Sequence, residues 1–545
     1  MKNPQSIPRI ITTAFSALLI ITATAQADVG DQVDKLIAGD GEMSDLFGFS
    51  VALSGTTAII GSLYDDDNAV DSGAAYLFDT VTGLETIKLI PINGEILEEF
   101  GRSVAINATT AIVGSPAKSV TCARSGSAYL FDTATGMQVA ELVPIGALCG
   151  GEFGKSVSIS GTTVVVGAPR DDDTCAETDL LNLTENCNQS GSAYLFDTVT
   201  GAQIARLIPD DADGGDLFGT SVAIYGSTVV VGAPGDSENG SMSGSVYLFD
   251  ANTGLQTAKL IPEDGSSSDL FGGFVAISGT TAIISAIGND ANGSFSGSAY
   301  LFDTATGLQI AKLIPNDGTS TLRFGGSVAI SGTTALVGAI GDNTNGSQAG
   351  SAYLFDTRTG SQITKLLADD GSNTDFFGYA VAISGSTTLI GASRNEGNEP
   401  LSGSAYLFES PAPIALASEV TSISHSAGGS QVLVLDGEAP RAGWTYFMLG
   451  SVTGTTPGID FGGGVVLPLN LDVYLLLTLK SPGLGLFNNF RGTLDSAGQA
   501  MATFSLPPIA DSSLVGLIFN HAYIAGPVIG TVSFASNAVP VTLVM

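Results

Sequence analysis

Short apolar runs alternate with small polar segments along most of this chain. Between residues 271 and 315, four runs rich in Val, Ile, Leu, Phe and Tyr are separated by segments rich in Gly, Asp, Asn, Ser and Thr. β-Branched and aromatic residues suit strands, and Gly, Asn and Asp suit the turns between them. The pattern predicts strands at Gly273–Ile277, Thr280–Ser285, Ser298–Phe302 and Leu308–Ile314.

The same pattern recurs seven times. Phe-Gly pairs and Tyr-Leu-Phe triplets share one register, with steps of 53, 53, 65, 53, 53 and 53 residues. The pairs begin at Phe47, Phe100, Phe153, Phe218, Phe271, Phe324 and Phe377, and the triplets at Tyr76, Tyr129, Tyr194, Tyr247, Tyr300, Tyr353 and Tyr406. A period near 50 residues with several short strands in each unit is typical of a β-propeller. The sequence therefore predicts an all-β, seven-bladed propeller over residues 28–412.

The fourth strand of each unit predicts how the ring closes. A basic residue followed by Leu marks this strand in five units, and Glu141 takes the basic position in the second unit. The seventh unit has no such strand after Tyr406, whereas Lys35-Leu36-Ile37 lies 53 residues before Lys88. We therefore expect the N-terminal strand to complete the last blade. A charged residue on each outer strand would also discourage edge-to-edge aggregation.

These units resemble the FG-GAP repeats of the integrin α-subunit propeller and of many secreted bacterial proteins. Besides the Phe-Gly pairs, Gly167-Ala168-Pro169 and Gly232-Ala233-Pro234 supply the second half of the motif. The resemblance covers about residues 32–410 and implies a propeller used for adhesion or ligand binding. Integrin-type calcium repeats carry an Asp-rich loop between the first two strands, where this chain has only Ser54-Gly55-Thr56. The units are closer to the short bacterial variant of the repeat, without that calcium site.

The two ends of the chain lie outside the repeats. Residues 1–27 have the pattern of a signal peptide, with Lys2 and Arg9, a short apolar run, and Ala25-Gln26-Ala27 as the cleavage site. An uncleaved membrane anchor is the alternative for this segment. Residues 413–545 contain strand-like runs separated by Gly, Pro and Asn, which predicts a C-terminal β-sandwich. We expect no membrane span once the signal peptide is removed.

The chain is strongly acidic, with a formal net charge of −34. So negative a surface argues against partners such as nucleic acid or anionic membranes. In a propeller, the loops after the second and fourth strands emerge on one face, and both sets are rich in carboxylates here. The densest runs are Asp65, Asp66 and Asp67, and Asp171, Asp172 and Asp173. Calcium prefers such oxygen ligands, so these six residues are the candidate metal ligands. The alternative is that they are solvated turn residues.

Four cysteines lie in neighbouring repeats. We expect the disulfides Cys122–Cys149 and Cys175–Cys187, which would suit an exported protein. Candidate catalytic residues are scarce, because the only two histidines, His425 and His521, follow the propeller. The favoured hypothesis is a secreted, non-enzymatic protein that binds an extracellular protein or glycan ligand for adhesion. The alternatives are a carbohydrate-active enzyme that uses loop carboxylates and a purely structural envelope protein.

Overall fold

The computed structural model describes residues 30–409, apart from residues 147 and 172–188, and a series of strands between residues 416 and 544. The predicted signal peptide lies outside the described residues. Val29–Pro411 form one compact unit, and the strands that follow belong to another.

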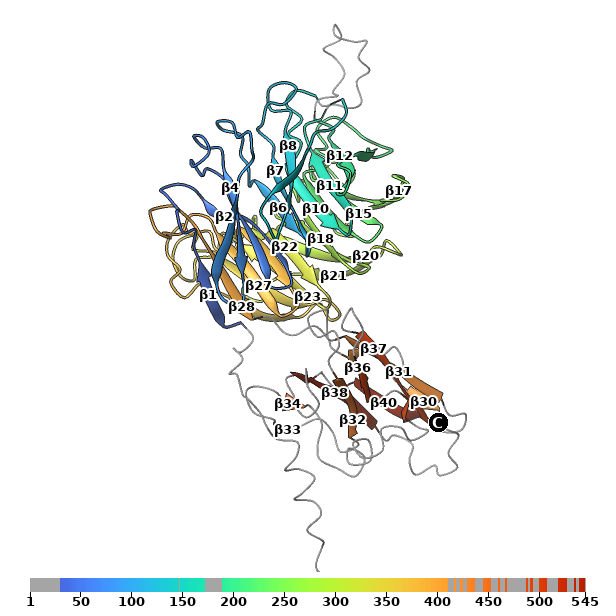
Figure 1. Ribbon diagram of the computed structural model, residues 1–545. Helices are drawn as coiled ribbons and strands as arrows, with labels where there is room; N and C mark the ends of the chain where they lie inside the picture. The colour runs from blue at the N-terminus through green and yellow to red at the C-terminus, as the bar shows by residue number, and fades with distance from the viewer. Residues whose placement is uncertain are drawn as a thin grey trace, which may run out of the picture. The chain divides into compact units, whose positions relative to one another are not determined.

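The first unit contains seven antiparallel four-stranded sheets, which we call blades 1 to 7 in the order of their first strands (Figure 1). The first strands are β2 (Phe47–Ser54), β6 (Ser103–Ile106), β10 (Ser156–Ser160), β14 (Ser221–Tyr225), β18 (Phe271–Ser278), β22 (Phe324–Ser331) and β26 (Ala380–Ser384). The second strands are β3 (Thr57–Ser62), β7 (Thr110–Ser115), β11 (Thr163–Ala168), β15 (Thr228–Ala233), β19 (Thr281–Ala286), β23 (Thr334–Ala339) and β27 (Thr387–Ala392).

The third strands carry the Tyr-Leu-Phe triplets, and the fourth strands lie at the outer edge of each blade. The third strands are β4 (Ala74–Asp79), β8 (Ser127–Asp132), β12 (Ser192–Asp197), β16 (Ser245–Asp250), β20 (Ser298–Asp303), β24 (Ser351–Asp356) and β28 (Ser404–Glu409). The fourth strands are β5 (Leu84–Leu89), β9 (Gln138–Leu142), β13 (Gln203–Leu207), β17 (Gln256–Leu260), β21 (Gln309–Leu313), β25 (Gln362–Leu366) and, in blade 7, β1 (Gln32–Leu36). β1 pairs antiparallel with β28, with Lys35 opposite Tyr406.

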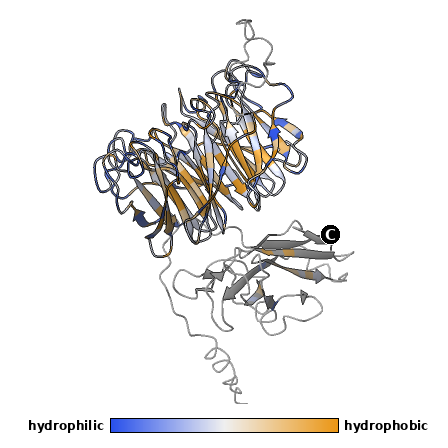
Figure 2. Cartoon of the chain, turned by 45° about the horizontal axis from the view of Figure 1, so that its top comes forward, coloured by the Kyte–Doolittle hydropathy of each residue, from blue (hydrophilic) through white to orange (hydrophobic). Residues whose placement is uncertain are grey.

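The first strands of neighbouring blades contact one another all the way round, from β2 and β6 to β26 and β2. They are therefore the innermost strands of a closed ring. The predicted all-β propeller with seven blades is confirmed. Coloured by hydropathy, the strands of the propeller are mostly hydrophobic and the connecting loops mostly hydrophilic (Figure 2).

The Phe-Gly pair packs between neighbouring blades and joins one blade to the next. Phe100 is fully buried, and its ring centroid lies 5.5 Å from that of Tyr129 and 5.9 Å from that of Phe131. Its backbone N–H donates to the carbonyl of Ser72 in the preceding blade. Gly101 has φ +87° and lies so close to the preceding blade that a Cβ would stand 2.3 Å from the carbonyl oxygen of Ala74. Only glycine fits such an approach.

Seven apolar cores fill the spaces between neighbouring blades. One core, for example, joins Leu389 and Leu407 of blade 7 to Phe47 and Tyr76 of blade 1. Each sheet is therefore covered on both faces, which explains why its strands are almost continuously apolar.

In the second unit, the described strands form two larger sheets. One contains β29 (Leu416–Ala417), β31 (Gly429–Asp436), β37 (Gln499–Leu506) and β35 (Phe487–Asn488). The other contains β30 (Ser422–Ser424), β40 (Val539–Val544), β38 (Ile518–Gly526), β32 (Thr445–Ser451), β36 (Arg491–Thr493) and β39 (Phe534–Ala535). A third, two-stranded sheet pairs β33 (Ile459–Asp460) with β34 (Val466–Leu467). The β-sandwich itself stays a prediction.

Candidate functional site

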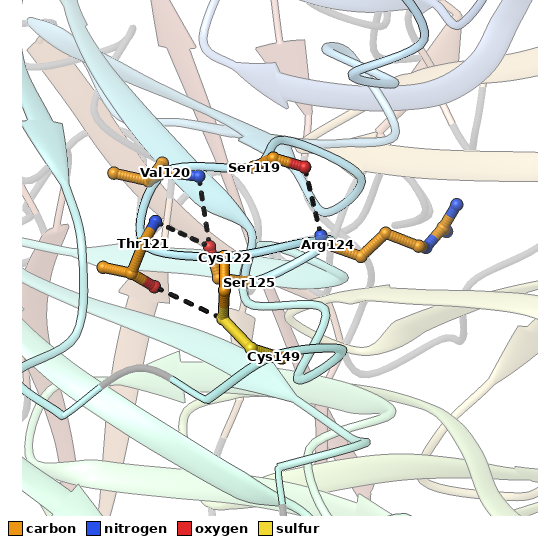
Figure 3. The surroundings of a disulfide bond; sticks show 7 residues. All are labelled: Ser119, Val120, Thr121, Cys122, Arg124, Ser125 and Cys149. Carbon is orange, nitrogen blue, oxygen red and sulfur yellow. Dashed lines mark hydrogen bonds between the residues drawn. A yellow bond between two sulfur atoms is a disulfide. The ribbon is translucent and has the colours of Figure 1, made fainter.

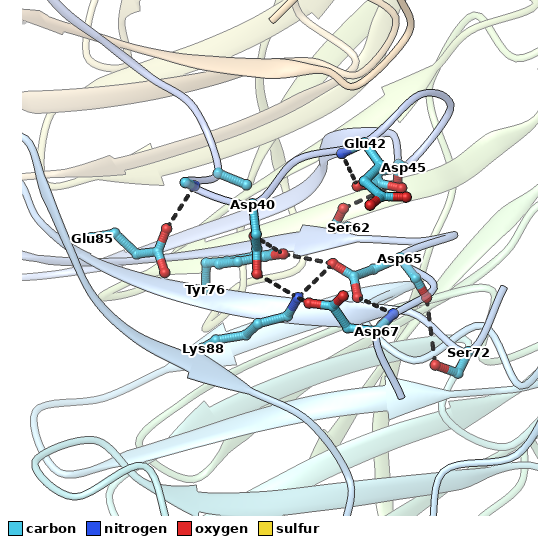
Figure 4. A network of polar contacts seen from close by, with 12 residues as sticks. Asp40, Glu42, Asp45, Ser62, Asp65, Asp67, Ser72, Tyr76, Glu85 and Lys88 are labelled. Atoms are coloured by element: carbon cyan, nitrogen blue, oxygen red, sulfur yellow. Dashed lines mark hydrogen bonds and ion pairs between the residues drawn. The ribbon is translucent and has the colours of Figure 1, made fainter. Parts of the chain in front are cut away.

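The predicted acidic loops meet around a lysine on the outer strand of blade 1 (Figure 4). Lys88 on β5 extends its ammonium between carboxylates from two loops. Its Nζ lies 2.8 Å from Oδ2 of Asp40, in the link that leads into blade 1. It also lies 3.0 Å from Oδ2 of Asp65 and contacts Asp67, both in the loop between β3 and β4. One cation therefore ties two loops to the strand edge.

A buried tyrosine completes the arrangement, which we call the lysine–carboxylate cluster. The hydroxyl of Tyr76 donates to Asp65 at 2.6 Å, and its oxygen lies 2.8 Å from Oδ1 of Asp40. The Lys88 ammonium lies over the same ring, 5.0 Å from the centroid. The tyrosine of the Tyr-Leu-Phe triplet thus joins the polar loops to the apolar core.

The cluster recurs around the propeller, but the residues at its three positions differ between blades. The outer-strand positions, from blade 1 to blade 7, are Lys88, Glu141, Arg206, Lys259, Lys312, Lys365 and Lys35. The corresponding positions in the second-to-third loops are Asp65, Lys118, Asp171, Asp236, Asn289, Asp342 and Asn395. The link positions are Asp40, Asn93, Gly146, Asp211, Asp264, Asp317 and Asp370. The basic side chain of six blades forms an ion pair with at least one of these carboxylates.

Blade 2 exchanges the charges of the cluster. Lys118 replaces the loop aspartate, and Glu141 replaces the outer-strand base. The Lys118 ammonium lies 5.4 Å from the centroid of the Tyr129 ring and 3.0 Å from Oε2 of Glu98, and both charged side chains are buried. Glu141 accepts a hydrogen bond from the Ser127 hydroxyl. The cation over the tyrosine is kept, although it comes from the second-to-third loop instead of the outer strand.

Charge pairing overcomes the cost of burial in the cluster of blade 4. Burial alone would raise the pKa of Asp236, but hydrogen bonds that include one from Lys259 hold it below its usual value. Burial would lower the pKa of Lys259, and its three carboxylate partners raise it instead. The depressed aspartate pKa means that the pairing stabilises the fold above about pH 4 and is lost on stronger acidification.

The candidate calcium ligands take different places in this arrangement. Asp65 and Asp67 lie together with Asp40, with carboxylate oxygens within 4.8 Å of one another. Asp66 turns away and accepts a hydrogen bond from the N–H of Asp71. Asp171 is buried and pairs with Arg206 at 2.9 Å. Asp172 and Asp173 lie outside the described residues.

Three carboxylates alone do not make a calcium site. Calcium takes six to eight oxygen ligands, and the Lys88 ammonium already stands among these three. The described residues of blade 1 therefore do not fit calcium while Lys88 keeps its position. Calcium binding by the acidic loops stays a prediction, and it would require Lys88 to move.

The repeats also identify the protein family to which the chain belongs. Comparison with protein-family models matches the FG-GAP repeat at residues 31–78, 84–131, 137–196, 202–249, 255–302, 308–355 and 361–408. The chain belongs to the FG-GAP repeat family. Each FG-GAP match begins at a fourth strand and ends in the third strand of the next blade, so it straddles two sheets. A search of curated proteins finds no match to this chain.

Sequence reasoning missed the lysine–carboxylate cluster of the FG-GAP blades. The basic residue of each outer strand was expected to act at an exposed edge, but Lys88 folds back over Tyr76. The pattern of basic residues marks Glu141 as an exception, but it does not point to Lys118, its partner in the exchange. The fixed repeat of 53 residues aligns Lys118 with Asp65 and is the feature of the sequence that could have revealed the exchange.

Cys122 and Cys149 form a disulfide between the second-to-third loop of blade 2 and the link into blade 3 (Figure 3). Neighbouring hydrogen bonds hold the Cys122 loop, where the N–H groups of Val120 and Thr121 both donate to the hydroxyl of Ser125. The other predicted pair, Cys175–Cys187, lies outside the described residues. No helix in the described part of the chain is long and apolar enough to cross a membrane.

We expect the double variant Cys122→Ser/Cys149→Ser to unfold more easily than the wild-type propeller. The disulfide spans 27 residues, and closing a loop of this length stabilises a fold by about 2–4 kcal/mol. Urea denaturation with and without a reducing agent measures the difference. If reduction affected the wild type and the double variant equally, the stabilisation would have to come from a different bond.

We expect acid to weaken the C-terminal unit through His521. This side chain is fully buried on β38, with its ring 4.7 Å from that of Phe504 on β37, and burial lowers its pKa to about 3. The unfolded chain binds the proton near pH 6.5, so stability falls by roughly 1.4 kcal/mol for each pH unit below that value until about pH 3. Thermal unfolding at pH 7, 6 and 5 tests this, with His521→Gln as the variant that should lose the dependence. The same pH dependence in both proteins would contradict it.

Proposed function

We propose that this FG-GAP protein is a secreted, non-enzymatic adhesion module that binds an extracellular protein or glycan through its loop face. The loop face is the side that carries the second-to-third loops and the links between blades. The proposal rests on the way these loops are held. In blade 1, Lys88 ties Asp40 of the link and Asp65 of the loop to one strand edge. Loops that are already held in one conformation before a ligand binds lose little conformational entropy on binding.

The loops share one backbone conformation at an equivalent position, where the side chain differs from blade to blade. One loop position has a left-handed backbone in all seven blades, with φ between 50° and 68°, and carries a side chain in each. Its residues are Asp71, Arg124, Gln189, Met242, Phe295, Gln348 and Leu401. A fixed backbone with acidic, basic, amide, apolar and aromatic side chains suits selective recognition by a rigid scaffold.

Secretion is the second part of the proposal. The N-terminal segment has the pattern of a signal peptide. The Cys122–Cys149 disulfide suits an oxidising compartment. FG-GAP repeats are typical of extracellular proteins, so the family match points the same way.

The enzyme alternative requires two opposed carboxylates or a histidine. The propeller sequence contains no histidine, and the loop carboxylates of blades 1, 4 and 6 are engaged by lysines. We therefore favour binding over hydrolysis. A purely structural role predicts no selective ligand, and the experiment below separates the two.

Steric blocking of one face tests the proposal. Beads coated with the protein would be washed over immobilised collagen, fibronectin, chitin and alginate, with albumin-coated beads as the blank. A polymer attached at Phe295→Cys, which is 53% exposed on the loop face, should abolish retention. The same polymer at Val199→Cys, 76% exposed in a third-to-fourth turn, should leave it unchanged.

Equal retention after both modifications would contradict the loop face as the binding surface. Retention no better than that of albumin beads on every support would contradict the adhesion proposal and favour the structural role.

A further inference from the structure

The otherwise similar repeats differ strongly at one position near the propeller axis. This is the second residue after the Phe of each Phe-Gly pair, at the loop-face end of the innermost strand. We call the seven residues the axial ring. From blade 1 to blade 7 they are Phe49, Arg102, Lys155, Thr220, Gly273, Gly326 and Tyr379. Each donates its N–H to the carbonyl three residues earlier, so the backbone turn is shared and only the side chain changes.

Blades 7, 1 and 2 form a continuous aromatic and cationic surface in this ring. The rings of Tyr379 and Phe49, from neighbouring blades, have centroids 4.9 Å apart. The guanidinium of Arg102 lies 5.1 Å from the Phe49 centroid. All three side chains are partly exposed. Aromatic rings offer apolar faces on which the C–H face of a sugar can pack, and a guanidinium binds an oxyanion such as a carboxylate or sulfate through two parallel hydrogen bonds.

Positive charge is concentrated on the same side of the axis. Among the residues that the structure describes, Arg102, Arg124, Lys155 and Arg170 pair with two carboxylates, Glu99 and Glu152. Within this described group four cations face two anions, in a chain whose net charge is −34. Burial, followed by repulsion from Arg102, lowers the pKa of Lys155, so the cations are crowded as well as numerous.

The other side of the ring carries almost no side chains. Blades 5 and 6 contribute Gly273 and Gly326, neither of which has a positive φ. A Cβ on Gly273 would come no closer than 3.4 Å to another residue, and one on Gly326 no closer than 3.3 Å. The backbone therefore does not require glycine here, in contrast to Gly101. At these two positions of the ring no side chain stands beside the aromatic and cationic groups.

We propose that the axial ring binds a sugar ring that carries a carboxylate or sulfate group. The anion pairs with Arg102 and Lys155, and the sugar ring stacks on Phe49 and Tyr379 with its far edge over Gly273 and Gly326. This assignment rests on the proposed function, because it names the ligand class and the place on the loop face where that ligand binds. It also gives the acidic propeller a reason to keep cations at its axis.

A panel of matched sugars tests the proposal on the full-length protein. Binding of glucuronate, glucose 6-sulfate and glucose would be measured by isothermal titration calorimetry. We expect at least one anionic sugar to bind tenfold or more tightly than glucose. Its affinity should fall about tenfold or more in Lys155→Gln, and also in Gly273→Leu, which adds a side chain at a glycine position of the ring without changing charge.

The control is Arg358→Gln, which removes a positive charge from the exposed Asp356 turn between the third and fourth strands of blade 6. This variant should bind as the wild type does. Melting temperatures close to that of the wild type would show that the variants are folded. Preference for carboxylate or for sulfate identifies which anion the ring accepts.

No preference for either anionic sugar over glucose would overturn this proposal, and so would equal losses in Lys155→Gln and Arg358→Gln. Those results would leave the adhesion test untouched, because blocking at Phe295 reports on any ligand of the loop face. Failure of both tests would overturn the proposed function as well.

Discussion

Replacing Gly101 by alanine should destabilise the propeller by more than about 3 kcal/mol. The new Cβ would stand 2.3 Å from the carbonyl oxygen of Ala74 and 3.3 Å from the backbone nitrogen of Ser62. Both are backbone atoms of the preceding blade, so the contact cannot be relieved by rotating a side chain. The backbone at φ +87° is also unfavourable for alanine.

Gly55→Ala is the matched control. Gly55 also has a positive φ, of +57°, but no atom lies within 4 Å of a Cβ built there. Its substitution should cost only about 1 kcal/mol, which is the usual penalty for a side chain in the left-handed region. Urea denaturation of the two variants measures the difference. Equal losses in the free energy of unfolding would show that close packing of the Phe-Gly pair between blades does not stabilise the propeller.

Replacing Lys259 by methionine should cost about 3–5 kcal/mol, because it strips a buried carboxylate of its cation. Its Nζ lies 3.1 Å from Oδ2 of Asp236, whose side chain is only 6% exposed. Two further carboxylates, of Asp211 and Glu238, approach the same ammonium at 2.7 and 3.0 Å. Without the lysine these three negative charges would repel one another.

Lys312→Met supplies the comparison in the next blade. The loop position there is Asn289, and the only ion-pair partner of Lys312 within the described residues is Asp264, which is 51% exposed. Exposed pairs contribute at most about 1 kcal/mol. Both lysines lie 5.2 Å from a tyrosine centroid, so the loss of that contact is common to both. Equal destabilisation would mean that the buried carboxylate does not determine the strength of the cluster.

The sequence was sufficient to predict the propeller. Two markers, the Phe-Gly pair and the Tyr-Leu-Phe triplet, repeat in one register because each serves the same junction: Phe100 packs against Tyr129 and Phe131. The C-terminal unit has no such period, and its strands range from two to nine residues. Its sheet arrangement therefore could not be derived in the same way.

The lysine–carboxylate cluster was harder to predict, because its members come from three separate segments. Asp40, Asp65 and Lys88 meet only when the link, the loop and the outer strand take their places in one blade. Counting acidic residues locates carboxylates in both sets of loops. It could not reveal that a lysine, assigned to a strand edge, would stand among those carboxylates.

The axial ring was present in the sequence but carried no signal at the level of strand patterns. Phe49 and Arg102 occupy equivalent positions in two repeats, and their difference looks like ordinary variation. The contact between them becomes visible only when neighbouring first strands lie side by side. Around the closed ring, these equivalent positions place aromatic and basic side chains in blades 7, 1 and 2 and glycines in blades 5 and 6.

We expect the loop face of this FG-GAP propeller to neutralise its buried carboxylates with its own lysine and arginine side chains. Thermal unfolding of the full chain in chelator and in excess calcium tests it, with Lys88→Met and Asp65→Asn as variants. We expect calcium to leave the wild-type melting temperature unchanged and to raise that of Lys88→Met, because the freed carboxylates then face no ammonium. A rise in the wild type that Asp65→Asn abolishes would mean that calcium binds these carboxylates in place of the Lys88 ammonium.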